Sequence, residues 1–275
     1  MSPRSTTRKE MTWTAGPYTT DLQKNAALIE EMTEILQLWQ PGMTLDELVQ
    51  RVIDLGGLGR VSRVRINDLV KRAFYQRFLR PDDRPARLAQ SVHRHAGAGR
   101  EYREVLFLTC IRTYPVIFDF LVERYWPALY TGRDVITGAE IQHFIRDKSN
   151  TERMPQPWGE SVTARVARNL GKTLADFDLF ENRRSPLRRI KPWEPCDFLV
   201  ELVLMEAHER GVGDTALLEL PEWRAFGMEK AVVVDRCRRI ASSGGPFLFQ
   251  YSGEIAQFSW RVETVGEYLD ARYAA

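Results

Sequence analysis

Three basic side chains recur at helical spacing in the middle of the chain. Arg165, Arg168 and Lys172 stand at i, i+3 and i+7, so at about 100° per residue they share one face of a predicted helix over 161–175. The apolar residues fall on the opposite face, namely Val162, Val166, Leu170 and Leu174, joined by Ala167 and Phe177. A solvated helix face usually mixes charges to form i,i+4 pairs. This face has no acid before Asp176, so the pattern favours an anionic partner over a merely solvated face.

The segments on either side of that helix strengthen this interpretation. A capping box, Thr137 to Glu140, opens a short helix upstream. Downstream, residues 182–191 contain no acid, and Pro186 and Pro192 exclude helix. The basic residues of that segment are Arg183, Arg184, Arg188, Arg189 and Lys191. Helix, turn, helix and basic hairpin outline a winged helix-turn-helix, in which the second helix enters the major groove and the wing contacts phosphate. The alternative for the wing is a solvated loop.

A second basic cluster lies in residues 60–80, where seven basic residues stand against Asp68 alone, a net of +6. The residues that we assign to a second binding surface are Arg60, Arg63, Arg65, Lys71 and Arg72. Arg65, Lys71 and Arg72 lie away from the predicted core. Arg63 and Arg77 project toward it, where they would snorkel or pair internally. The cluster therefore fits a binding surface and a structural role equally well.

Hydrophobic periodicity predicts a mainly α-helical chain, a helical bundle with a helix-turn-helix-like N-terminal part, a winged-helix-like middle and a small β-hairpin. The predicted domains are a disordered tail (1–13), a helical domain (14–130) and a C-terminal domain (131–275), divided into 131–192 and an acidic part, 193–275. A capping box at Thr44 opens the second helix, and a third helix follows over 61–79. Residues 93–99 are predicted to form a loop, and 105–122 a buried helix kinked near Pro115. Further helices are predicted over 195–210, 228–241 and 263–272, with the hairpin over 247–251 and 255–260.

Charge is distributed unevenly along the chain. The net charge is only +2, but residues 192–275 carry 8 Lys and Arg against 14 Asp and Glu, a net of −6. The remaining 31 basic and 23 acidic residues give 1–191 a net of +8. Such asymmetry indicates a basic binding surface in the first two thirds.

Cysteine usage and hydropathy bear on the cellular location. Cys110, Cys196 and Cys237 are far apart and form no CxxC pair, which fits a reducing cytoplasm. The first residues lack the apolar core of a signal peptide. Charged residues interrupt the longest apolar run, so we expect no membrane span.

Enzyme motifs are weak. The chain contains no Walker A, GxGxxG, GxSxG or HExxH pattern. His93 and His95 have no carboxylate or thiol near them in sequence, which favours surface histidines over a metal site. Asp176 and Asp178 could hold a metal, but acids at a helix end followed by arginines more often pair with them. We therefore expect no enzymatic activity, no metal and no cofactor.

The chain resembles the BrxA family of the bacterial BREX phage-defence systems from about Thr14 to Leu269. The stretches that carry the resemblance are Tyr18-Thr19-Thr20, the Arg-rich helix after Gly56-Gly57-Leu58-Gly59, and the run Trp158…Ser161…Arg165…Arg168, which leads through Leu174-Ala175-Asp176-Phe177-Asp178-Leu179-Phe180 to a basic strand. The resemblance implies a small, mostly helical, non-enzymatic protein that binds double-stranded DNA. Its N-terminal region would be similar to an RNA-binding antitermination fold. It would be encoded beside a methyltransferase, an ATPase, a phosphatase and a protease-like protein.

Residues and resemblance together predict a cytoplasmic, double-stranded-DNA-binding accessory protein of phage defence. One alternative is an assembly subunit that binds other defence proteins through the acidic, aromatic C-terminal third. RNA binding is a second alternative, since the basic residues alone do not distinguish RNA from DNA. A nuclease using Asp176 and Asp178 is the least favoured.

Overall fold

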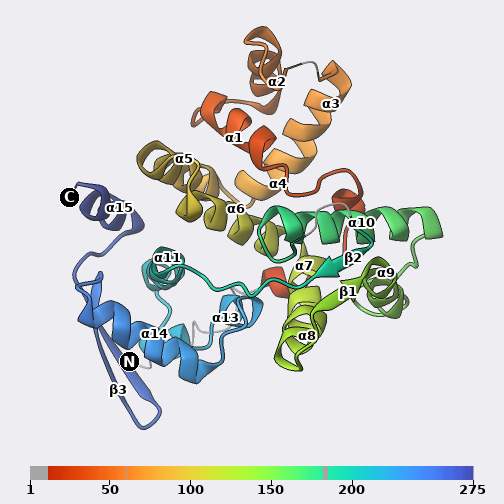
Figure 1. Cartoon of the computed structure of the whole chain (residues 1–275). Helices are drawn as coiled ribbons and strands as arrows, with labels where there is room; N and C mark the ends of the chain where they lie inside the picture. The colour runs from red at the N-terminus through yellow and green to blue at the C-terminus, as the bar shows by residue number, and fades with distance from the viewer. Residues whose placement is uncertain (1–11, 60, 182–184, 275) are drawn as a thin grey trace, which may run out of the picture. The chain divides into compact units, whose positions relative to one another are not determined.

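The structure is a computed structural model and describes residues 12–59, 61–181 and 185–274. The chain forms two compact units, one of residues 15–192 and one of 193–275 together with the N-terminal residues through Thr14. Both are built mainly from helices, and the smaller unit carries a two-stranded hairpin (Figure 1). This confirms the predicted mainly-α fold with a small C-terminal hairpin.

Short, closely packed helices make up the larger unit. They are η2 (Thr20–Gln23), α1 (Ile29–Leu38), α2 (Leu45–Asp54), α3 (Arg63–Asp68), η3 (Leu69–Phe74), α4 (Tyr75–Phe78), α5 (Arg84–Ala96), α6 (Arg100–Thr113), α7 (Pro115–Phe120), η4 (Leu121–Tyr125), α8 (Trp126–Tyr130), α9 (Gly138–Asp147) and α10 (Glu160–Asp176). The π-helical η3 joins α3 to α4, so the predicted third helix runs without a break. Both capping boxes form: Thr44 caps α2 with Glu47, and Thr137 caps α9 with Glu140.

Two predictions about this unit were wrong. Helix α5 continues to Ala96, so His93 and His95 lie on a helix rather than in a loop. Pro85 stands in the first turn of α5, where its missing N–H is not required. The stretch expected to be one kinked helix is broken at Tyr114 into α6 and α7, which are bent by 101°. The cause is Pro115, which begins α7 and disfavours helical backbone at the preceding residue.

No single helix in the part of the chain that the structure describes is long and apolar enough to cross a membrane. The bent pair formed by 100–113 and 115–130 meets the length and composition criteria only when its two arms are taken together.

A small sheet closes the larger unit. Strand β1 (Val135–Thr137) pairs antiparallel with β2 (Leu187–Arg189). The end of β2 also pairs back on the segment after α10: Glu181 N–H donates to the Arg189 carbonyl at 3.0 Å and Lys191 N–H to the Leu179 carbonyl at 2.9 Å. Residues 179–181 and 187–191 therefore pair as the two arms of a hairpin (the 179–191 hairpin), and the second arm lies between the first arm and β1.

The smaller unit surrounds a buried helix. Its elements are η1 (Thr12–Thr14), α11 (Asp197–Glu209), α12 (Asp214–Leu217), α13 (Pro221–Ala225), α14 (Lys230–Ser242), β3 (Phe247–Ser252), β4 (Ile255–Trp260) and α15 (Val265–Tyr273). The side chains of 198–205 are all buried, as a central helix requires. Strands β3 and β4 form the predicted hairpin, with Ser252 paired to Ile255 across a two-residue turn.

A buried arginine ties the N-terminal segment to the core of the larger unit. Arg77 is 3% exposed and donates to the carbonyls of Asn25 at 2.9 Å and Ala26 at 2.6 Å, and to that of Ala27. Its Nε also donates to the Tyr114 hydroxyl at 3.2 Å. Arg77 was predicted to project inward, and this is confirmed. Arg63, predicted to do the same, is exposed at the start of α3.

Replacing Arg77 with Leu should lower the free energy of unfolding by about 3 kcal/mol or more, because several buried carbonyls lose their donor at once. Arg63→Leu, the matched change at the exposed end of the same helix, should have little effect. Urea unfolding of both variants measures the difference. Equal losses would contradict the structural role of Arg77.

Candidate nucleic-acid interface

Helix α10 has the two faces that its sequence predicts. Val166, Leu170 and Leu174 are fully buried, with α9, β1 and β2 gathered beneath the helix in Figure 1. Arg165 and Arg168 are exposed on the opposite side, and Lys172 is half-buried there. The burial of one apolar stripe therefore orients the three cations outward together.

These three cations have no acidic counterpart in the described part of the chain. Arg165 donates to the Ser161 hydroxyl at 2.8 Å, one turn earlier on α10. Arg168 and Lys172 make no ion pair or side-chain hydrogen bond with any described residue. Glu160, at the start of α10, pairs instead with Arg146 of α9. The exposed face of α10 thus keeps its positive charge available to an external anion.

One flank of α10 is held by the N-terminal segment. The Asn169 amide donates to the carbonyls of Leu22 at 2.9 Å and Gln23 at 2.8 Å. Leu22 belongs to η2 and is fully buried. Because both ends of this contact are fixed, the cationic face is presented on a constrained helix rather than on a mobile one.

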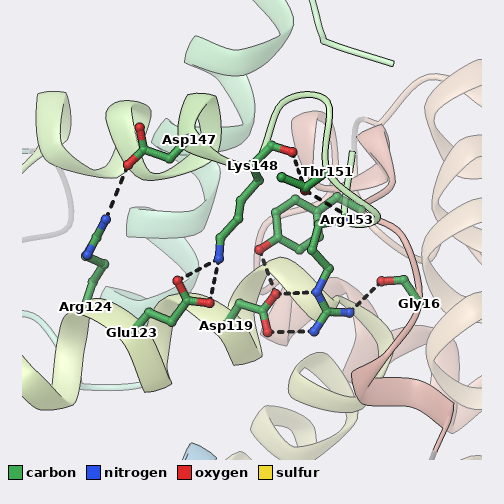
Figure 2. Close-up of polar contacts among 9 residues, drawn as sticks. Gly16, Asp119, Glu123, Arg124, Asp147, Lys148, Thr151 and Arg153 are labelled. Atoms are coloured by element: carbon green, nitrogen blue, oxygen red, sulfur yellow. Dashed lines mark hydrogen bonds and ion pairs between the residues drawn. The ribbon is translucent and has the colours of Figure 1, made fainter. Parts of the chain in front are cut away.

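The turn between α9 and α10 is fastened by a partly buried ionic cluster (Figure 2). Arg153 in this turn pairs with Asp119 of α7 at 2.8 Å and donates to the Gly16 carbonyl at 2.9 Å. The Tyr18 hydroxyl donates to the same Asp119 at 2.8 Å, and Tyr18 N–H donates to the Arg153 carbonyl. Burial and the adjacent Asp119 raise the pKa of the Tyr18 phenol far above its usual range, so it remains a donor. This cluster joins residues 16–18, α7 and the approach to α10.

A second layer of ion pairs surrounds that cluster on the same elements. Lys148, just after α9, pairs with Glu123 of η4 at 2.6 Å. Arg124 of η4 pairs with Asp147 at the end of α9 at 3.3 Å (Figure 2). These side chains are more exposed than Asp119, so each pair stabilises the fold less.

The structure places the predicted wing residues in different environments. Successive side chains of a strand point to opposite faces, so in β2 Leu187 and Arg189 are exposed whereas Arg188 is 5% exposed. Arg188 was expected to reach phosphate, and its burial removes it from that surface. Lys191 is exposed and pairs with Asp178 at 3.5 Å. Arg183 and Arg184 lie outside the described residues.

Most cations of the second basic cluster, in residues 60–80, are bonded to neighbouring groups. Arg65 donates to the Lys24 carbonyl at 3.1 Å and to the Asn25 side chain at 3.4 Å. Lys71 pairs with Asp46 of α2, and Arg72 with Asp68 one turn away. Arg63 is exposed and has no ion pair among the described residues, whereas Arg60 lies outside them. Of the cations placed by the structure, Arg63 is therefore the most available in this cluster.

The candidate metal and catalytic residues serve other contacts. The Asp176 carbonyl accepts from Arg103 of α6 at 2.6 Å, and Asp178 pairs with Arg103 and Lys191. His93 packs on the ring of Tyr102. Within residues 12–59, 61–181 and 185–274, no three His, Cys, Asp or Glu side chains are grouped so that they could hold a metal ion.

Sequence reasoning missed Asn169, Arg153, Asp119 and Gly171. The first three act through partners at least 34 positions away in sequence, so no local pattern marks them. Gly171 did carry a signal, because a glycine inside a helical pattern is unfavourable by about 1 kcal/mol relative to alanine and often marks a close approach.

Replacing Asp119 with Ala should lower the free energy of unfolding by about 2 kcal/mol. This is less than the roughly 3–5 kcal/mol for a fully buried pair, because the Arg153 side chain is 22% exposed. The control is Glu123→Ala, which removes the more exposed pair with Lys148 and should cost under about 1 kcal/mol. Urea unfolding compares them, and a larger loss for Glu123→Ala would contradict this ranking.

Comparison with known proteins agrees with the boundaries of the larger unit. A family model described as BrxA matches residues 16–193, close to the limits of that unit. A crystal structure of an uncharacterized protein from Magnetospirillum magneticum is similar over 71% of this chain and 95% of that chain, with 17% sequence identity and a TM-score of 0.54. At that identity the similarity shows a shared fold alone. Comparison with curated proteins gave no match. Because the family model covers well over half of its length, the chain belongs to the BrxA family, which is associated with BREX phage defence.

Proposed function

We propose that this protein binds double-stranded DNA without modifying it, as a cytoplasmic accessory component of a BREX system. Arg165, Arg168 and Lys172 contact the groove and its adjacent phosphates. Arg189 and Lys191, together with Arg183 and Arg184, which lie outside the described residues, contact the flanking backbone. Arg63 and its neighbours on α3 add a weaker second contact.

The observation that carries this proposal is the exposed face of α10. It presents three cations that have no acidic partner among the described residues, on a helix that is held along its other faces. A fixed array of Arg and Lys is suited to phosphate, since each side chain can neutralise one backbone charge without first giving up an internal ion pair.

The order of elements gives independent support. Strand β1, helices α9 and α10, the 179–181 segment and β2 follow one another in the order of a winged helix-turn-helix. In that motif the second helix lies in the major groove and the wing contacts the backbone. The larger unit, which the family model matches, contains all of these elements.

Reversing the charge of two α10 residues tests the proposal. The Arg165→Glu, Arg168→Glu double variant should lose duplex binding by at least about 100-fold at moderate salt. Its folding should be unchanged, because both side chains are exposed. The matched control is Arg80→Glu, Arg94→Glu, the same four-unit change of charge at two exposed positions, one just after α4 and one on α5, and it should weaken binding far less. Fluorescence anisotropy with a labelled duplex measures all three proteins, and similar losses in both variants would remove α10 from the interface.

A salt titration distinguishes the nucleic-acid class. The logarithm of the duplex affinity should fall linearly with the logarithm of salt concentration, by about 0.9 per neutralised phosphate. Hairpin RNA and single strands, measured under the same conditions, should bind more weakly. A preference for hairpin RNA would replace the DNA proposal with an RNA one.

One surface favours a second role in assembly with other BREX proteins. The outer face of the β3–β4 hairpin exposes Leu248 at 54% and Ile255 at 72%, and its other exposed residues are uncharged. These are Gln250, Ser252, Gln257 and Ser259. An uncharged face that exposes two large apolar side chains, in a segment (192–275) of net charge −6, is suited to protein contact. Co-expression with the methyltransferase, ATPase, phosphatase and protease-like proteins tests it: Leu248→Glu, Ile255→Glu should abolish co-purification and leave duplex affinity unchanged.

A further inference from the structure

Arg188 is a buried guanidinium between β2 and α10. It is 5% exposed, and its Nη1 donates to the Gly171 carbonyl in the middle of α10 at 3.1 Å. Its guanidinium carbon lies 5.9 Å from the centre of the Phe180 ring, at the start of the hairpin. Burial lowers the pKa of Arg188, and the nearby Asp176 carboxylate opposes that shift. One side chain of β2 thus contacts both the helix and the first arm of the hairpin.

The helix leaves space for this guanidinium at Gly171. A Cβ on Gly171 would lie 2.6 Å from the Arg188 Cζ and closer still to its Nε, so no other residue type fits while Arg188 keeps its position. Gly171 is buried and lies on one flank of α10, one turn after Arg168. Arg188 therefore contacts α10 from that flank, beside the face that carries the cations.

The Arg188 side chain bonds β2 directly to α10. The backbone bonds of the hairpin lead to β1 and to residues 179–181: Ile190 N–H donates to the Asp134 carbonyl at 2.8 Å and Lys191 N–H to the Leu179 carbonyl at 2.9 Å. These bonds fix the strands relative to one another, whereas the Arg188–Gly171 contact joins β2 directly to the helix. The exposed Arg189 is the next residue along β2, so the place of its side chain depends on where Arg188 is held.

We propose that Arg188 is a positioning residue that sets the register of the 179–191 hairpin against α10, so that Arg189 reaches the same duplex as the α10 cations. It binds no phosphate itself. That Arg189 reaches the duplex rests on the proposed function, whereas the coupling of Arg188 to the hairpin does not.

Two variants remove the contact by different routes. Arg188→Met removes the guanidinium and keeps a long apolar side chain. Gly171→Ala keeps the arginine but occupies its place, and alanine favours helix over glycine, so α10 itself is not weakened. If both variants have the same effect, its cause is the loss of the contact and not the loss of the charge. Arg153→Met, another partly buried arginine of the same unit, is the control for general destabilisation.

Amide hydrogen exchange tests the coupling without DNA. In Arg188→Met and Gly171→Ala, the amides of Glu181, Ile190 and Lys191 should exchange at least about tenfold faster, while those of 166–170 in α10 stay protected. Arg153→Met should not produce this selective change. Unchanged hairpin exchange in both variants, or equal acceleration along α10, would overturn the positioning role whether or not the protein binds DNA.

A double-mutant cycle tests the consequence for binding. Arg189→Ala should weaken duplex binding by roughly fivefold in the wild type and have almost no effect in the Arg188→Met or Gly171→Ala background. Arg168→Ala should keep its full effect in all three. If Arg189→Ala costs the same factor in every background, the hairpin is placed without Arg188. If the wild-type protein does not bind duplex DNA at all, the proposed function fails, and the exchange measurement alone decides the role of Arg188.

Discussion

The structure around the candidate site depends on how firmly α10 is held along its buried side. Asn169 bonds to η2, Arg188 supports the helix from β2, and Arg103 bonds to the carbonyl of Asp176 at its end. Three like charges on one exposed face repel one another, which opposes the folded state. The buried apolar stripe and these polar contacts offset that repulsion, so the cationic face forms without a counterion from the described part of the chain.

Arginine has two distinct uses in this protein. Arg77, Arg188 and Arg236 are buried, and each donates to at least one backbone carbonyl. The planar guanidinium suits this use because it presents several hydrogen-bond donors in fixed directions. Arg165, Arg168 and Arg189 are exposed and make no ion pair with a described residue. A count of basic residues therefore overstates the surface available to an anion.

The two units differ in charge and in their relation to the family. The larger one carries the basic helices and corresponds to the region that the BrxA model matches. The smaller one, of residues 193–275 with the N-terminal residues, lies almost entirely outside that match, and residues 192–275 have a net charge of −6. An acidic surface repels phosphate, so nucleic-acid contact and protein contact would be assigned to different units. Arg236, bonded to Glu194 and Asp197, shows that part of the acidic charge is neutralised within its own unit.

Local patterns determined the elements that depend on local physics. Both capping boxes, the amphipathic α10, the continuous helix from α3 to α4 and the C-terminal hairpin follow from residues close together in sequence, and all are confirmed. The direction of individual basic side chains was decided by tertiary structure. Arg188 turns inward because β2 pairs with β1, about 50 residues earlier, and strand alternation then fixes its side. Arg63 is exposed because it is the first residue of α3 and precedes the buried residues of that helix. Spacing along the chain identifies a face, but only the packing of distant segments decides which face is buried.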